Sequence, residues 1–92
     1  MIVGSLRVRL LIRQARSLKD KRRVTRSIRD RLRNSFNVSV AEIESQDHRQ
    51  LLVFGIAMVG IDGREVTSTL DRIVEALRLH PEAELLDYQR EE

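Results

Sequence analysis

Alternating apolar and polar residues mark the first segment of the chain. In residues 2–12 the even positions are apolar except at Gly4, whereas the odd positions include Arg7 and Arg9. A period of two residues is typical of a strand with one buried face. The sequence therefore predicts a strand over residues 2–12, with Arg7 and Arg9 pointing away from the core.

Two later segments have the spacing of amphipathic helices. In the first, apolar residues recur at every fourth position and Ser17 precedes them as an N-cap, which predicts a helix over residues 18–34. Its apolar positions are Val24, Ile28 and Leu32. A second helix is predicted to begin after the cap Asp62 and to end near Leu79, because Pro81 disfavours helical backbone just before it.

Three further segments are predicted to be strands. Residues 37–45 are rich in β-branched side chains, and residues 50–61 are apolar enough for a central strand, with a polar turn between them. Residues 83–88 predict a short last strand, and residues 89–92 are expected to fray. The order β-α-β-β-α-β predicts a single α+β domain over residues 1–92. It is a ferredoxin-like sandwich, a four-stranded antiparallel sheet with two helices on one face.

Composition excludes several classes of function. The 92 residues contain no cysteine, which removes disulfide frameworks, thiolate zinc sites and cysteine nucleophiles. The longest apolar run, residues 51–59, is far shorter than the ~20 residues of a membrane span, and no signal peptide is evident. We therefore expect a cytoplasmic protein without a membrane partner.

Charge is distributed unevenly along the chain. Residues 1–33 hold twelve basic and two acidic residues, a local net charge of +10, whereas residues 34–92 hold five basic and twelve acidic residues, a net charge of −7. Such asymmetry is a recognised feature of proteins with nucleic-acid or membrane-surface partners. The alternative is that folding interleaves the two blocks.

Five cations of the first predicted helix fall on one stripe. At 100° per residue they lie between about 140° and 220° from Val24, roughly opposite the apolar face. They are Lys19, Arg22, Arg26, Arg29 and Arg33. Because like charges at this spacing repel, the stripe predicts a phosphate-backbone partner, with Arg16, Arg7 and Arg9 as further candidate contacts. The alternative is a solvated charged face.

The uncovered face of the predicted sheet is the second candidate surface. By strand parity it carries mainly apolar side chains, with Gly55 leaving a gap. They are Val3, Leu11, Leu51, Val53, Ala57 and Val59. An apolar face of this kind predicts a partner, which we expect to be a second copy of the chain, unless arginine stems cover it.

Base stacking and catalysis find little support in the sequence. The chain has three aromatic residues, and Phe54 has the parity of the core face, so the stacking platform of an RNA recognition motif is missing. His48 and His80 are predicted to be solvated turn residues. Glu42 and Glu44 are expected to share a strand face, but nothing else marks them as an acid–base pair. We expect no catalytic residues, metal or cofactor, and no enzyme activity.

Two motifs resemble those of a known family. Residues 17–23 (SLKDKRR) and 36–42 (FNVSVAE) resemble the YlxP-like family of small bacterial proteins of unknown function, and the likeness covers residues 2–79. The resemblance implies a ferredoxin-like fold, and genes near those for transcription and translation factors such as ribosome-binding factor A. Relatives have an aromatic residue near the turn where this chain has His48 and Arg49, so the resemblance lends that turn no binding role.

Two functional hypotheses follow. The first is a non-enzymatic RNA- or ribosome-associated module that binds phosphates through the basic helix. The second is a homodimeric protein-interaction or small-ligand regulatory domain that uses the open sheet face.

Overall fold

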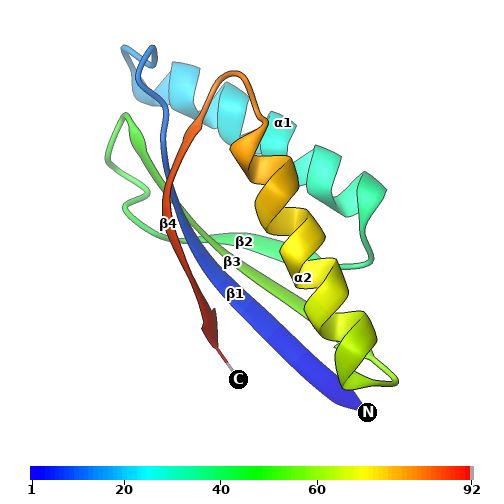
Figure 1. The fold of residues 1–92 in the computed structure, drawn as a ribbon. Helices are drawn as coiled ribbons and strands as arrows, with labels where there is room; N and C mark the ends of the chain where they lie inside the picture. The colour runs from blue at the N-terminus through cyan, green and yellow to red at the C-terminus, as the bar shows by residue number, and fades with distance from the viewer. Residues whose placement is uncertain (92) are drawn as a thin grey trace.

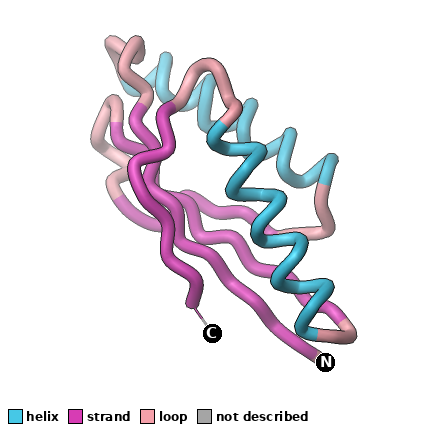
Figure 2. The backbone as a smooth tube through the Cα atoms, viewed as in Figure 1, coloured by secondary structure: helices cyan, strands magenta, loops and turns pink. Residues whose placement is uncertain are grey.

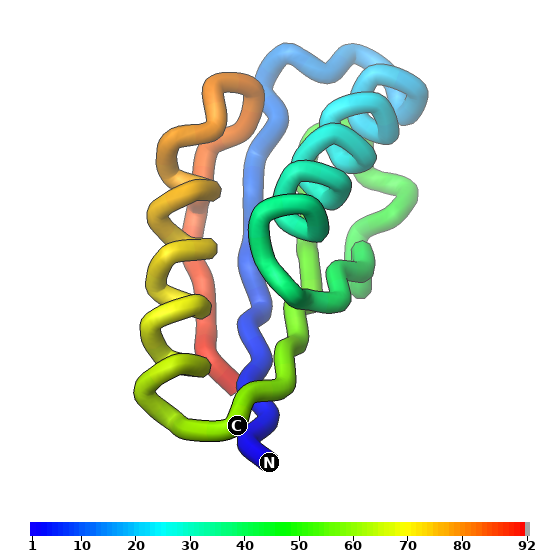
Figure 3. Tube along the Cα trace, turned by 90° about the vertical axis from the view of Figure 1, so that its right-hand side faces the viewer, coloured from blue at the N-terminus to red at the C-terminus, as the bar shows by residue number. Residues whose placement is uncertain are grey.

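The computed structural model describes residues 1–91 as two helices packed on one sheet. The elements are β1 (Ile2–Leu11), α1 (Leu18–Ser35), β2 (Ser39–Glu44), β3 (Leu51–Gly60), α2 (Gly63–Arg78) and β4 (Glu84–Glu91). The sheet order is β2-β3-β1-β4, and every neighbouring pair is antiparallel. Both helices lie on the same face of the sheet (Figures 1, 2 and 3). The predicted ferredoxin-like α+β architecture is confirmed.

The core lies between the two layers. The alternating residues Leu6, Val8 and Leu10 of β1 are buried, as are Phe54 and Ile56 of β3. The apolar stripes of both helices close over them, as their spacing predicts. Within residues 1–91, neither helix combines the length and the apolar composition needed to cross a membrane.

Gly4 interrupts the apolar series of β1 because α2 packs against the sheet at that point. A Cβ atom on Gly4 would overlap with Cγ1 of Val66, and a Cβ atom on Gly60 would lie 2.7 Å from Cγ2 of the same valine. The two glycines therefore allow α2 to approach the ends of both central strands.

Both helices begin at the predicted caps. The side-chain oxygen of Ser17 accepts a hydrogen bond from the backbone N–H of Asp20, and Asp62 accepts one from Glu65. The Asp20 carboxylate in turn accepts from the backbone N–H of Arg16, so the entry to α1 is fixed from both sides.

Strand β2 differs from its prediction in length and in facing. It begins at Ser39 rather than at residue 37, and its register shifts so that Glu42 lies opposite Phe54 and Glu44 lies opposite Val53. This bulge at Ile43 turns Glu42 towards the helices and Glu44 towards the open face. The prediction that Glu42 and Glu44 share a face is therefore wrong.

The last strand is longer than predicted. β4 continues to Glu91, whose backbone carbonyl accepts a 2.7 Å hydrogen bond from the hydroxyl of Ser5. The prediction that the tail frays is wrong for residues 89–91, because they pair with β1, and residue 92 lies outside the described residues. A second register shift, at Leu86, interrupts the pairing of β4 with β1.

Candidate nucleic-acid interface

The basic stripe lies on the outward side of α1. The helix buries Lys21, Val24, Thr25, Ile28 and Leu32 against the rest of the molecule. The opposite side carries the five predicted cations Lys19, Arg22, Arg26, Arg29 and Arg33. Four of them are exposed, and the side chain of Arg29 is 36% exposed. We call these five residues the α1 stripe.

The acidic second half of the chain leaves the α1 stripe unpaired. Within residues 1–91, the one ion pair of a stripe residue joins Arg29 Nε to Asp30 Oδ1 at 4.0 Å, a neighbour on the same helix. That nitrogen has no hydrogen-bond partner. Folding therefore does not bring carboxylates from residues 34–91 onto the stripe.

The acidic residues pair instead with arginines elsewhere. Arg7 binds Glu44 of β2 at 2.6 Å, and Arg9 binds Asp87 of β4 at 2.5 Å. The hydrogen bond with Glu44 raises the pKa of Arg7. Both arginines lie on the open face of the sheet, so the sheet separates them from α1. Arg7 and Arg9 therefore do not lie on the same surface of the molecule as the α1 stripe.

Arg16 lies in the loop between β1 and α1, at the end of the helix where the stripe begins. Its backbone is held by Asp20, while its side chain is exposed and makes no ion pair within residues 1–91. The structure thus places Arg16 three residues before Lys19, at the same end of the molecule.

One cation of α1 has a different role that the sequence analysis missed. Lys21 is 1% exposed, its Nζ lies 2.7 Å from Glu42 Oε2, and it donates a 2.8 Å hydrogen bond to the carbonyl of Ser45. At 100° per residue Lys21 falls about 60° from Val24, inside the apolar sector, so a helical wheel could have identified it. Lys21 and Glu42 belong to the two family motifs, which this buried pair joins.

The open sheet face is less exposed than its sequence suggests. Val3 and Val59 are each 56% exposed, Ala57 is exposed, and Leu11 and Leu51 are half-buried.

Val53 was predicted to be part of the partner face, but it is 1% exposed and so is not accessible to a partner. The ion pair of Arg7 and Glu44 joins β1 to β2 across β3 and covers that strand beside Val53. Ile43, displaced by the bulge, fills the space over Gly55 and adds an exposed apolar side chain that the sequence analysis missed.

Of the three aromatic residues, the sequence placed only Phe54, on the core face, and this prediction is confirmed. Phe54 is fully buried in the core. The guanidinium of Arg72 lies 5.5 Å from the centroid of Phe36, and that of Arg78 lies 5.8 Å from the centroid of Tyr88. With all three rings placed this way, no pair of aromatics forms a base-stacking platform on the two central strands.

The two histidines occupy different surroundings. His48 is an exposed turn residue, as predicted, and its Nδ1 accepts hydrogen bonds from the backbone of Gln50 and Leu51. His80 is 9% exposed, so its prediction as a solvated residue is wrong. Burial, and next the charge of Arg31, lower the pKa of His80. Within residues 1–91 no group of three histidine or carboxylate side chains could hold a metal ion.

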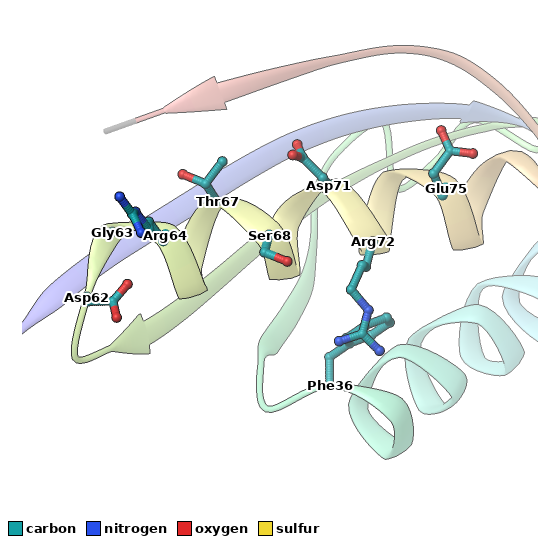
Figure 4. A pocket seen from close by; sticks show the side chains of 9 residues that line it. All are labelled: Phe36, Asp62, Gly63, Arg64, Thr67, Ser68, Asp71, Arg72 and Glu75. Atoms are coloured by element: carbon teal, nitrogen blue, oxygen red, sulfur yellow. The ribbon is translucent and has the colours of Figure 1, made fainter.

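The surface of α2 contrasts with that of α1. An open concavity of about 1350 Å³ lies between Phe36 and the outward side of α2 (Figure 4). Its charged lining residues have mixed signs: Asp62, Asp71, Glu75, Arg64 and Arg72. Interspersed charges of this kind produce no uniform field, unlike the cations of the α1 stripe.

Fold and charge together define a two-layer ferredoxin-like domain with one exposed basic helix. Comparison with known proteins identifies its family. Residues 3–90 match the family described as "Protein of unknown function (DUF503)". The chain is also 37% identical over 83 residues, 90% of each chain, to "Uncharacterized protein YlxP" of Bacillus subtilis (strain 168). The chain therefore belongs to this family, and the resemblance carried by its two motifs is confirmed.

Proposed function

We propose that this protein is a non-enzymatic cytoplasmic module that binds the phosphate backbone of RNA through the α1 stripe. The observation that carries the proposal is that four of the five stripe residues are exposed and that, within residues 1–91, none of the five pairs with the acidic residues that follow the stripe in the chain. Backbone phosphates are the commonest partners of such unpaired cationic surfaces.

The spacing of the stripe suits a linear polyanion. Its residues follow one another at intervals of three and four, and fourteen residues separate Lys19 from Arg33, which is about 21 Å along the helix axis. A row of cations on a rigid helix fixes several phosphates at once. Since no aromatic platform reads the bases, the binding depends on backbone charge rather than on sequence.

We name RNA rather than DNA as the partner because the family resemblance implies genes near those for translation factors. A test therefore includes both polymers. For five contacts to single-stranded RNA, the affinity is expected to fall with salt with a log–log slope of about −3.5. A slope near zero would contradict binding to the backbone, and equal affinity for single-stranded DNA of the same sequence would remove the preference for RNA.

The decisive variant reverses two charges of the stripe. Arg22→Glu/Arg26→Glu should abolish binding at moderate salt while the domain stays folded, because both side chains are exposed. The matched control Arg64→Glu/Arg72→Glu makes the same change in net charge on α2, and should retain binding. Fluorescence anisotropy measures affinity and circular dichroism measures folding. Unchanged affinity in the stripe variant, or an equal loss in the control, contradicts the proposal.

A second candidate function rests on the open sheet face. Val3, Val59 and Ile43 are exposed there, while Arg7 and Arg9 are neutralised by carboxylates of the same face. Such a face does not repel a second copy of itself, whereas the α1 stripe does. Register shifts in both edge strands disfavour edge-to-edge pairing. We therefore propose that a second copy of the chain packs against this face, sheet to sheet.

The size of the face is adequate for this homodimer. The longest sides of the molecule measure 42 by 21 Å, and a face of that size gives about 800 Å² per partner, a standard interface. Sedimentation at high micromolar concentration should show a dimer that Val59→Asp converts to a monomer. Ile61→Asp, an exposed position beyond the end of β3, is the control. A strict monomer of the unaltered chain contradicts this candidate.

A further inference from the structure

Three arginines from two separate parts of the sequence line one concavity at one end of the molecule. The loop between β1 and α1, residues 12–17, lies there beside the turn between β2 and β3, residues 45–50 (Figure 1). Between them is an open concavity of about 700 Å³ whose charged lining residues are Arg13, Arg16 and Arg49. Within residues 1–91, no carboxylate lines it.

The concavity is built on a fixed backbone. Gln50 donates hydrogen bonds from Nε2 to the carbonyls of Arg13 and Ala15, at 3.0 and 3.4 Å. The carbonyl of Gln50 accepts a 2.8 Å bond from the N–H of Ile12. A single residue of the turn thus binds the loop at three points, which holds Arg49 near the other two arginines.

A second connection anchors the turn to α1. The buried ammonium of Lys21 binds the carbonyl of Ser45, at the start of the turn, and the carboxylate of Glu42. Because the turn is tied to both the loop and the helix, the relative positions of the three arginines are set by the fold. A backbone fixed in this way keeps the three side chains within reach of one bound anion, so only the side chains need ordering on binding.

The positive charge of the concavity is only weakly compensated. Arg13 pairs with Glu84 at 2.6 Å, but both side chains are at least half exposed, and such pairs contribute little. The side chains of Arg16 and Arg49 make no ion pair within residues 1–91. Planar guanidinium groups bind phosphate oxygens with two parallel hydrogen bonds, so the site is suited to a phosphoryl group.

We infer that this concavity binds a terminal phosphate of the RNA whose backbone lies along the α1 stripe. A phosphodiester carries one negative charge, whereas a terminal phosphate carries close to two at neutral pH. Three arginines that line one concavity, with no carboxylate among its lining residues within residues 1–91, match the doubly charged group. The inference rests on the proposed function, because it assigns the end of the same RNA to the end of the stripe.

The experiment compares three oligonucleotides of one sequence: with a 5′-phosphate, with a 3′-phosphate, and with neither. We expect the full chain to bind one phosphorylated form about ten-fold more tightly than the unphosphorylated one, the effect of one added charge-assisted contact. Which form is preferred identifies the end. Equal affinity for all three overturns the inference, and leaves the proposed function intact if the α1 stripe variants still lose binding.

Variants locate the effect in the concavity. Arg16→Ala/Arg49→Ala should remove the preference for the phosphorylated end. Because Arg16 is also a candidate contact of the RNA backbone, the affinity for the unphosphorylated RNA should fall as well, but by a smaller factor. Neither side chain makes an ion pair within the described residues, so the variant should fold, which circular dichroism checks. Arg64→Ala, at the start of α2, is the control and should keep the preference. If the preference survives in the double variant, the phosphate binds elsewhere. If none of the three RNAs binds, both the inference and the proposed function are overturned.

Discussion

The arginines of β1 and those of the α1 stripe belong to the same basic third of the chain, yet they have different electrostatic surroundings in the folded protein. On the sheet, Arg7 and Arg9 meet Glu44 and Asp87 from the two edge strands. On the helix, Arg22 and Arg26 are exposed and make no ion pair within residues 1–91. The charge asymmetry of the sequence is thus cancelled on one side of the molecule and retained on the other. The retained part, rather than the net charge, is what a polyanion would contact.

Lys21 provides a third case on the same helix. It is enclosed between α1 and β2, where the Glu42 carboxylate and the Ser45 carbonyl replace water around its ammonium. Of the eight cations of α1, one, Lys21, therefore holds the fold together, and five form the α1 stripe on the solvent side. The other two are Arg23, which pairs with Glu82 at 2.9 Å, and Arg31, whose charge acts on His80. Substituting members of each group separates their effects on stability.

The largest effect is expected for Lys21→Met. This variant leaves Glu42, whose side chain is 19% exposed, without its partner. Loss of one member of a buried ion pair should lower the free energy of unfolding by about 3 kcal/mol. Urea unfolding measures it, and Lys21→Met/Glu42→Leu should recover much of the loss because no charge then remains buried. Lys19→Met, on the exposed side, should change stability by at most about 0.5 kcal/mol. Equal losses for Lys19→Met and Lys21→Met would abolish the distinction between the two groups.

The parts of the fold that could be predicted depend on local periodicity. The apolar spacing of Val24, Ile28 and Leu32 identified the buried side of α1, and the same geometry placed the stripe opposite it. The caps Ser17 and Asp62 were predictable because the hydrogen bond of a cap joins residues three positions apart. These features need no knowledge of tertiary structure.

The parts that could not be predicted depend on contacts between elements. The bulge at Ile43 reverses the facing of Glu44, and no residue type in this segment signals an inserted position. Without it, Glu44 would not reach Arg7. Arg49 joins Arg13 and Arg16 only because the turn folds back on the loop, which sequence separation conceals.

The second-largest effect is expected in the pKa of His80, which responds to a positive charge on α1. Burial and the neighbouring charge of Arg31 lower its pKa, while Glu82 opposes them, so the folded chain takes up the proton at lower pH than the unfolded chain does. The stabilising contribution of neutral His80 is therefore complete above about pH 6.5, and is lost as the pH falls below that value.

This electrostatic influence can be measured directly by NMR titration. In Arg31→Gln the pKa of His80 should rise towards its ordinary value, because one positive charge is removed, while burial continues to hold it down. In Arg7→Gln, where the lost charge is on the opposite side of the sheet, the pKa should not change. Equal shifts in the two variants would show that His80 responds to overall charge rather than to α1.

The smallest effect is expected for the removal of single exposed arginines from β1 and from α1. It is also the most direct test of the difference between the two elements, because the change in stability should have opposite signs. Arg7→Gln removes an exposed ion pair and should destabilise the domain slightly, because such pairs contribute little in water. Arg26→Gln should stabilise it by a few tenths of a kcal/mol, because three cations, Arg22, Arg23 and Arg29, lie one turn from Arg26 and only Asp30 at i+4 offsets them. Glutamine has a similar helix propensity. Urea unfolding at low salt measures both, and about 1 M salt should abolish both differences. If Arg26→Gln instead destabilises the domain at low salt, the stripe is not self-repelling, and the argument that it exists to meet a polyanion loses its physical basis.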